Sequence, residues 1–169
     1  KFREVLYGNH PYGRVFPSED ILQSFTLQDV KSFYGKNFGA ARARLYVAGV
    51  FDMEAMEDAI RKSFSGWDSG SAMTVNLPSP ESKREVRLVN RPGAIQSSIY
   101  MGLPTVSPTH DNWLELNITN FLLGGMFASR ITSNIREDKG YTYSPRSSVS
   151  VRKGDAYWAQ TADVTTEVT

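Results

Sequence analysis

The 169-residue chain carries 19 Lys and Arg against 18 Asp and Glu, and 40% of its residues are hydrophobic. This apolar content excludes disorder, and the balanced, interspersed charges do not support nucleic-acid binding. The sequence has no cysteine, which excludes disulfides and cysteine-based catalytic or metal sites within this segment. Its longest apolar runs, such as 45–50, are too short to span a bilayer.

The first half is expected to hold two helices around a buried strand. Residues 7–14 are rich in turn formers and predict a loop. Thr26 is a good N-cap for a helix over 26–37, and Asp52 is a good N-cap for a helix that ends near residue 65. Between them, the continuous apolar run 43–50 is typical of a buried strand.

The Ser-, Gly- and Pro-rich stretch 68–84 is the best candidate for a linker. We therefore expect residues 1–67 to be the end of a first α+β unit and residues 85–169 to open a second one. The chain begins at Lys1 rather than Met and stops on a Thr-rich stretch, so we expect both ends to be cut. The lack of a targeting signal then says nothing about compartment, and the bacterial periplasm and cytoplasm both stay open.

The second half predicts strands, a long interrupted helix and a hairpin. Apolar residues at helical spacing over 112–136 indicate a helix that Gly124-Gly125 divides, and Gly140 is placed to end it. Patterns of alternating or apolar residues indicate the strands. The predicted strands are 85–89, 96–103 (ended by Pro104) and the two arms of a hairpin, 142–151 and 155–163.

The usual catalytic signatures are absent from the sequence. There are only two histidines and no His-x-x-Glu-His, too few ligands for a zinc site contained in this segment. There is also no phosphate loop and no nucleophile elbow, and Gly124-Gly125 follows a helical pattern rather than a strand. We interpret His10 and His110 as structural loop histidines, so no catalytic and no metal-binding residue is expected here.

One stretch, 122–143, could carry chemistry. It predicts a helix that ends near Arg136, a glycine turn, and a strand that starts at Tyr143. A guanidinium fork and a phenol held close together suit the binding of a peptide carbonyl or an oxyanion. The alternative is that Arg136 pairs with a nearby carboxylate and Tyr143 packs in the core. The residue pattern alone slightly favours that alternative.

The same stretch resembles the signature of the second half of the pitrilysin/insulinase family of zinc metallopeptidases. In that family a leucine-rich helix leads into Gly-Gly, Ser-Arg and a Leu-Arg-Glu-x-x-Gly-x-x-Tyr-like segment. The corresponding residues here are Leu123-Gly124-Gly125, Ser129-Arg130 and Ile135-Arg136-Glu137-Asp138-Lys139-Gly140-Tyr141-Thr142-Tyr143. In the last segment, Ile135 replaces the usual leucine.

Softer motifs in the family's order extend the resemblance over nearly the whole chain. They are Gly8-Asn-His-Pro-Tyr-Gly-Arg14, Thr26-Leu-Gln-Asp-Val-Lys-Ser-Phe-Tyr34, Val47-Ala-Gly-Val-Phe-Asp52, Phe64-Ser-Gly-Trp67 and Gln96-Ser97.

The resemblance implies LuxS-like or processing-peptidase-like α+β units, each with an antiparallel or mixed sheet and helices packed on one face. It implies a parent zinc metalloendopeptidase in which this segment is not catalytic alone. Zinc and the general base would lie before Lys1, in the other half of the chain or in a partner subunit. Arg136 and Tyr143 would bind the peptide or protein substrate and stabilise the oxyanion.

Two alternatives remain. The parent could be a non-catalytic subunit that binds peptides or a zinc-bearing partner, or a structural relative of the core proteins of respiratory complexes. The intact Arg136/Tyr143 pair argues mildly against the purely structural role.

Overall fold

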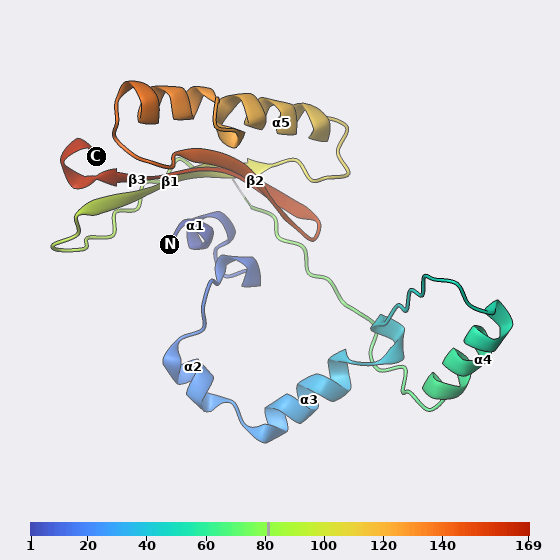
Figure 1. The fold of residues 1–169 in the computed structure, drawn as a ribbon. Coiled ribbons are helices and arrows are strands. Elements are labelled where there is room, and N and C mark those ends of the chain that lie inside the picture. The colour runs from blue at the N-terminus through green and yellow to red at the C-terminus, as the bar shows by residue number, and fades with distance from the viewer. Residues whose placement is uncertain (81) are drawn as a thin grey trace. The chain divides into compact units, whose positions relative to one another are not determined.

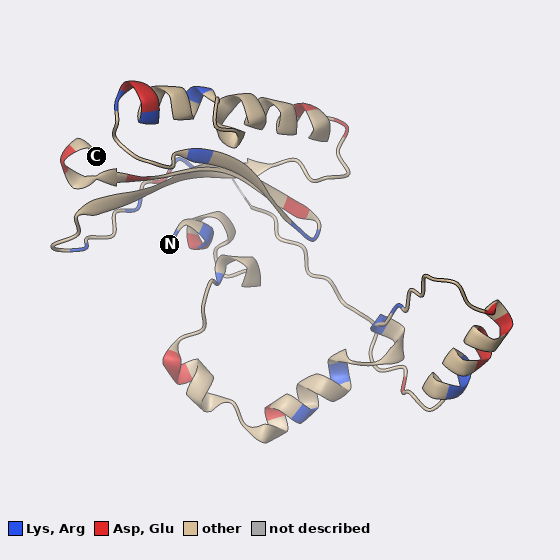
Figure 2. Ribbon diagram, in the orientation of Figure 1, with Lys and Arg blue, Asp and Glu red and all other residues tan. Residues whose placement is uncertain are grey.

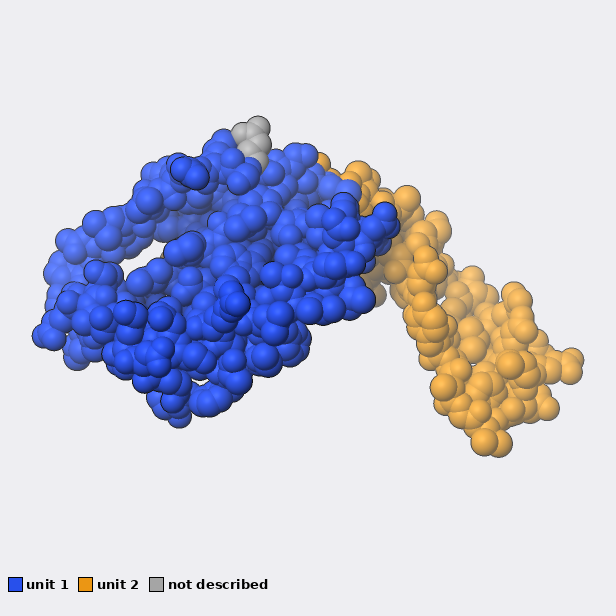
Figure 3. Space-filling model, turned by 90° about the horizontal axis from the view of Figure 1, so that it is seen from above, with its two compact units in different colours: residues 1–16, 77–169 blue, residues 17–76 orange. Residues whose placement is uncertain are grey.

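A computed structural model describes residues 1–80 and 82–169. The chain forms two compact units, coloured separately in Figure 3. The first comprises Lys1–Phe16 together with Leu77–Thr169, and the second comprises Pro17–Asn76.

The first unit is built on a three-stranded antiparallel sheet (Figure 1). Its strands are β1 (Gln96–Thr105), β2 (Arg146–Arg152) and β3 (Asp155–Thr165), in the order β1-β3-β2. The sheet and the surrounding helices confirm the predicted α+β class. β1 continues through Pro104, where we expected it to end. An edge strand tolerates proline because one side of its backbone needs no ladder partner.

The predicted hairpin is present, with its turn at Lys153-Gly154. Arg152 pairs with Asp155, and Gly154 adopts a φ of 70°, a conformation that glycine reaches without steric cost. The turn therefore sits where the sequence places it, although β2 begins only at Arg146 and not at residue 142.

A helical layer covers one face of the sheet (Figure 1). It contains α5 (Trp113–Asn120) and the π-helical turn η3 (Phe121–Gly125) that continues it. The side chain of Asn120 is buried, and its Oδ1 accepts hydrogen bonds from Ser147 Oγ of β2 at 2.8 Å and from Trp158 Nε1 of β3 at 3.0 Å. One amide oxygen thus joins the helical layer to two strands.

Gly124 provides the close approach that this joint requires. A Cβ atom at Gly124 would lie 2.6 Å from Ser147 Oγ and 2.8 Å from Ser147 N. The glycine therefore allows η3 to touch the backbone of β2, and the pair Gly124-Gly125 has a packing role.

The short helix α1 (Phe2–Tyr7) and the 3₁₀ turn η1 (Pro11–Gly13) supply apolar side chains to a cluster on the sheet. We expected helices on one face only, yet Tyr157 and Ala159 of β3 contact Leu6 and Tyr7, while the neighbouring Trp158 bonds to the α5 side. Because successive residues of a strand point to opposite faces, β3 is covered on both.

Tyr7 also makes a polar contact in this cluster. Its hydroxyl donates to Asp155 Oδ2 at 2.5 Å, and both residues are buried. Burial and the Asp155 carboxylate both raise the pKa of Tyr7 well above its ordinary value near 10.

The second unit contains α2 (Glu19–Ser24), α3 (Leu27–Asn37), η2 (Ala40–Arg42) and α4 (Met53–Phe64). Of these, α3 and α4 are the two helices that the capping residues predicted. Thr26 and Asp29 form a reciprocal capping box at the start of α3, and Asp52 Oδ1 accepts the Ala55 N–H at 2.8 Å at the start of α4.

The strands predicted at 43–50 and 85–89 do not form. Neither segment has a ladder partner among the described residues, and their apolar side chains are exposed: Val50 and Val86 are 107% and 94% accessible. A strand is stable only when a neighbouring strand satisfies its backbone groups. These two expectations are therefore wrong for this structure.

The compact units do not follow the predicted limits. Residues 1–16 belong with the sheet rather than with 17–67, and part of the expected linker is ordered: Ala40 N and Ala41 N donate to the carbonyls of Asp68 and Ser69 at 2.8 and 2.9 Å. The expected limits concerned α+β domains of a longer protein, and as such they stay a prediction.

Charge is interspersed in both units, with basic and acidic residues following one another along the helices (Figure 2). Within residues 1–80 and 82–169, no helix has the length and apolar character needed to cross a bilayer.

We predict that Gly124→Ala lowers the free energy of unfolding by about 1–3 kcal/mol, the usual cost of overpacking. Urea unfolding followed by circular dichroism would measure it. Gly35→Ala is the contrasting variant, because it lies in α3 with nothing within 4 Å of an added Cβ. It should leave stability unchanged or raise it by up to about 1 kcal/mol. Equal losses in both variants would contradict the packing role of Gly124.

We predict that Tyr7→Phe lowers the free energy of unfolding by about 1–3 kcal/mol at neutral pH, because the buried Asp155 carboxylate loses its donor. A raised folded-state pKa contributes stability that is complete below the unfolded value near 10 and is lost as pH rises above it. The wild type should therefore lose its advantage over Tyr7→Phe above about pH 10. Tyr100→Phe, at an exposed tyrosine of the same unit, is the control.

Candidate functional site

The segment that carries Arg136 begins directly after the glycine pair. The chain turns at Met126–Ala128, Ser129 follows, and the helix continues through the π-helical stretch η4 (Thr132–Asp138). Ser129 is 1% exposed, and its hydroxyl accepts the N–H of Thr132 at 3.4 Å. A buried serine thus starts the helix on which Arg136 lies.

A glycine turn ends this helix, as the sequence predicted. Gly140 adopts a φ of 64°, its N–H donates to Arg136 O, and Tyr141 N donates to Ile135 O, both at 3.0 Å. This pair of bonds is the usual way to end a helix with glycine in the left-handed conformation. The turn reverses the chain and returns Tyr143 toward Arg136.

The structure brings Arg136 and Tyr143 together. The guanidinium carbon of Arg136 lies 4.3 Å from the centroid of the Tyr143 ring and 4.7 Å from that of Phe127. Both separations fall within the range of cation–π contacts, each worth about 0.5–2 kcal/mol depending on exposure. The guanidinium group therefore contacts two aromatic rings. One belongs to a residue that precedes Arg136 in the sequence, and the other to a residue that follows it.

Several polar atoms of the pair are not hydrogen-bonded within the described residues. Arg136 Nε contacts Glu137 Oε1 at 3.1 Å, and the terminal nitrogens Nη1 and Nη2 have no acceptor among the described residues. The Arg136 side chain is 27% exposed, whereas Tyr143 is 79% exposed. The N–H groups of the two terminal nitrogens and the phenol hydroxyl can therefore donate to a bound molecule.

The sequence left open the alternative that Arg136 pairs with a carboxylate and Tyr143 packs in the core. The structure agrees with this alternative only in part. Arg136 does pair with a carboxylate, but through Nε and with its sequence neighbour Glu137, so the outer fork is not used. Tyr143 is too exposed to be a core residue and instead stacks on the guanidinium.

Sequence reasoning missed Phe127 as a member of the site. It lies between the glycine pair and Ser129, outside any helical period, and nothing in the local pattern connects it with an arginine nine positions later. Only the turn at Met126–Ala128 places its ring against Arg136.

Both histidines have the local structural contacts expected for loop residues. His10 Nδ1 accepts the N–H of Tyr12 at 3.2 Å, and His110 Nδ1 accepts the N–H of Asn112 at 3.1 Å just before α5. Each imidazole thus bonds the backbone two residues later, which is a common turn interaction.

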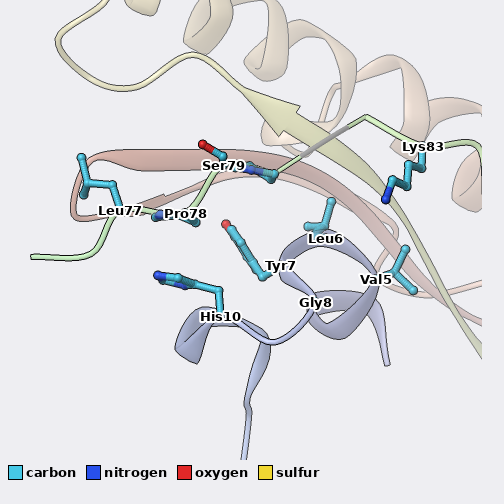
Figure 4. A pocket seen from close by; sticks show the side chains of 10 residues that line it. Val5, Leu6, Tyr7, Gly8, His10, Leu77, Pro78, Ser79 and Lys83 are labelled. Atoms are coloured by element: carbon cyan, nitrogen blue, oxygen red, sulfur yellow. The ribbon is translucent and has the colours of Figure 1, made fainter.

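A cavity of about 310 Å³ adjoins His10 in the first unit (Figure 4). Figure 4 shows Tyr7 and His10 facing the extended segment 77–79, with Lys83 at the other end. None of the residues that line this cavity belongs to the stretch 127–143. The cavity and the Arg136/Tyr143 pair therefore have no residue in common.

The residues present do not fit a metal site. Within the described part of the chain, no group of three or more His, Asp or Glu side chains is arranged to hold a metal ion.

Comparison with known proteins assigns the family. The model of the peptidase M16 inactive domain matches residues 24–169. The chain belongs to the M16 peptidase family. This confirms the resemblance to the pitrilysin/insulinase zinc metallopeptidases, and the matching region corresponds to the domain that the family describes as inactive.

The relatives are larger proteins. An uncharacterized zinc protease of Bacillus subtilis, YmxG, is 28% identical over 142 residues, which cover 83% of this chain and 34% of that protein. An uncharacterized zinc protease of Mycobacterium leprae is 25% identical, covering 89% of this chain and 35% of the relative. The chain thus spans about a third of the length of the curated relatives that it matches.

The fold agrees with a solved structure. A crystal structure of a peptidase M16 inactive domain from Pseudomonas fluorescens matches 98% of this chain and 40% of that chain, with a TM-score of 0.78 and 19% identity. At this identity the match supports the fold of an M16 inactive domain.

We predict that Gly140→Ala lowers the free energy of unfolding by about 1–2 kcal/mol, because alanine is strained in the left-handed conformation. The matched control is Gly66→Ala, which also follows a helix and also has open space around an added Cβ, but has no positive φ. Urea unfolding of both variants should show a loss only at Gly140. Equal stability of Gly140→Ala and wild type would contradict the strained turn.

Proposed function

We propose that this segment supplies the substrate-binding pair of a zinc-dependent endopeptidase, with Arg136 and Tyr143 holding the peptide and stabilising the oxyanion of the tetrahedral intermediate. The observation that carries the proposal is the guanidinium held against two rings, whose outer nitrogens, like the neighbouring phenol hydroxyl, have no hydrogen-bond partner among the described residues. Hydrogen-bond donors fixed before the reaction are what oxyanion stabilisation requires.

The geometry of the pair suits a carbonyl oxygen that gains negative charge. The Arg136 fork offers donors in one plane, and the rings of Phe127 and Tyr143 restrict how that plane can rotate. A charged donor forms stronger hydrogen bonds with a developing oxyanion than with a neutral carbonyl, so binding is tighter in the transition state.

The remaining catalytic groups belong outside this segment. We place zinc and the general base in the other part of a longer chain or in a partner subunit, in accordance with the names of the relatives. Zinc bound there supplies Lewis-acid polarisation of the scissile carbonyl. Arg136 and Tyr143 must then be brought into register with that site, because proximity supplies much of the rate.

The test uses the intact protein and a peptide substrate. Arg136→Ala and Tyr143→Phe should each reduce kcat/KM by about ten- to a thousand-fold, the usual effect of removing one oxyanion donor. Folding should be nearly unaffected, because Tyr143 is exposed and Tyr143→Phe keeps the ring that stacks on Arg136.

Two further variants sharpen this experiment. Tyr141→Phe removes an exposed tyrosine hydroxyl two residues away and should leave kcat/KM unchanged. Arg136→Lys keeps the charge but loses the planar fork, so it should lose activity nearly as Arg136→Ala does. Wild-type activity in both Arg136→Ala and Tyr143→Phe would disprove the proposed role.

Zinc content of the intact protein decides where the other half of the site lies. About one tightly bound zinc per chain would place both halves in one polypeptide. Absence of zinc would mean that the pair serves the active site of a zinc-bearing partner subunit, which pull-down from the native source should then recover.

A further inference from the structure

A chain of hydroxyl groups links the start of the Arg136 helix to the segment that follows Tyr143. Ser129 Oγ donates to Thr132 Oγ1 at 3.0 Å, and Thr132 Oγ1 donates to the carbonyl oxygen of Pro145 at 3.4 Å. Ser129 and Thr132 are only 1% and 4% exposed, and Pro145 is buried as well. These bonds are therefore shielded from competition with water.

The positions of these bonds matter for the geometry of the site. Thr132 lies four residues before Arg136 on the same helical stretch, which is about one turn, and Pro145 lies two residues after Tyr143. The bond between Thr132 and Pro145 therefore closes the loop that contains both Arg136 and Tyr143. The bonds of Gly140 and Tyr141 to the helix end hold the same loop at its tip.

Tyr143 needs such support because the fold does not hold it by burial. Its side chain is 79% exposed, and within the described part of the chain its ring is held by the contact with Arg136. A surface cation–π contact alone is weak against the rotamer freedom of both side chains. The backbone on each side of Tyr143 must therefore be fixed if the ring is to stay over the guanidinium.

We propose that Ser129 and Thr132 are positioning residues for the Arg136/Tyr143 pair. Their hydroxyl relay sets the distance between the helix and the segment 143–145, and through it the distance between the guanidinium and the phenol. The relevance of this hydroxyl relay to catalysis rests on the proposed function. Its effect on the geometry of the Arg136/Tyr143 pair does not.

The first experiment measures that geometry directly in the full chain. The Nε–H proton of Arg136 lies beside two aromatic rings, so its NMR resonance should be shifted by their ring currents. Thr132→Val keeps the shape but removes the hydroxyl, and should move this resonance toward that of an exposed arginine. Thr132→Ser keeps the hydroxyl and should retain the wild-type resonance.

The matched control is Ser147→Ala. It removes another buried hydroxyl of the same unit, but one that bonds to Asn120 rather than to the 143–145 segment. It should leave the Arg136 resonance in place. Ser129→Ala, which removes the first donor of the relay, should move the resonance in the same direction as Thr132→Val and serves as the test if that variant does not fold.

An unchanged Arg136 resonance in Thr132→Val or Ser129→Ala would overturn the positioning role, and so would an equal change in Ser147→Ala. In the intact protein, Thr132→Val should reduce kcat about tenfold with little change in KM, and Thr132→Ser should restore it. A moved resonance together with unchanged kcat/KM would support the positioning role and overturn the proposed function instead.

Discussion

The architecture of the first unit depends on the hydrogen bonds that the Asn120 side chain accepts. One amide oxygen receives Ser147 Oγ from β2 and Trp158 Nε1 from β3, and so fixes the end of α5 above two neighbouring strands. Leaving these donors unpaired in a buried position would cost about 1–3 kcal/mol each. Gly124 lets the next turn touch β2, and from that contact the chain proceeds to Ser129 and the Arg136 helix. The buried polar joint thus fixes the helical layer on the sheet, and the segment that carries the site follows directly after it in the chain.

The site itself combines buried, hydrogen-bonded residues with exposed groups that are available to a ligand. Ser129 and Thr132 are buried and bond within the fold, whereas Tyr143 is exposed and the outer nitrogens of Arg136 have no acceptor among the described residues. Such a division agrees with the general requirement that groups which stabilise a transition state be held in place before the substrate arrives. It is also the arrangement that the proposed contribution of this segment to a metallopeptidase requires.

Local signals predicted the local features of the fold correctly. Thr26 with Asp29, Asp52, Gly140 and the Gly154 turn each act within a few residues, and each occurs in the structure where the sequence indicates it. The strand at 43–50 was wrong because apolar character shows only that a segment prefers burial, whereas a strand also needs a partner distant in sequence. Phe127 was missed for the same reason, since its contact with Arg136 depends on a turn that no periodic pattern announces.

The exposed run over 43–50 has a consequence for the handling of this segment in isolation. Its sequence, Ala-Arg-Leu-Tyr-Val-Ala-Gly-Val, contains the β-forming residues Tyr46, Val47 and Val50 and no acidic residue. It has no ladder partner among the described residues, and Tyr46 and Val50 are exposed. Short segments of this kind pair readily with copies of themselves and form cross-β assemblies. Arg42, just before the run, and Arg44, its second residue, provide the charge repulsion that counters such stacking. Solubility of the isolated segment should therefore fall as ionic strength rises and this repulsion is screened.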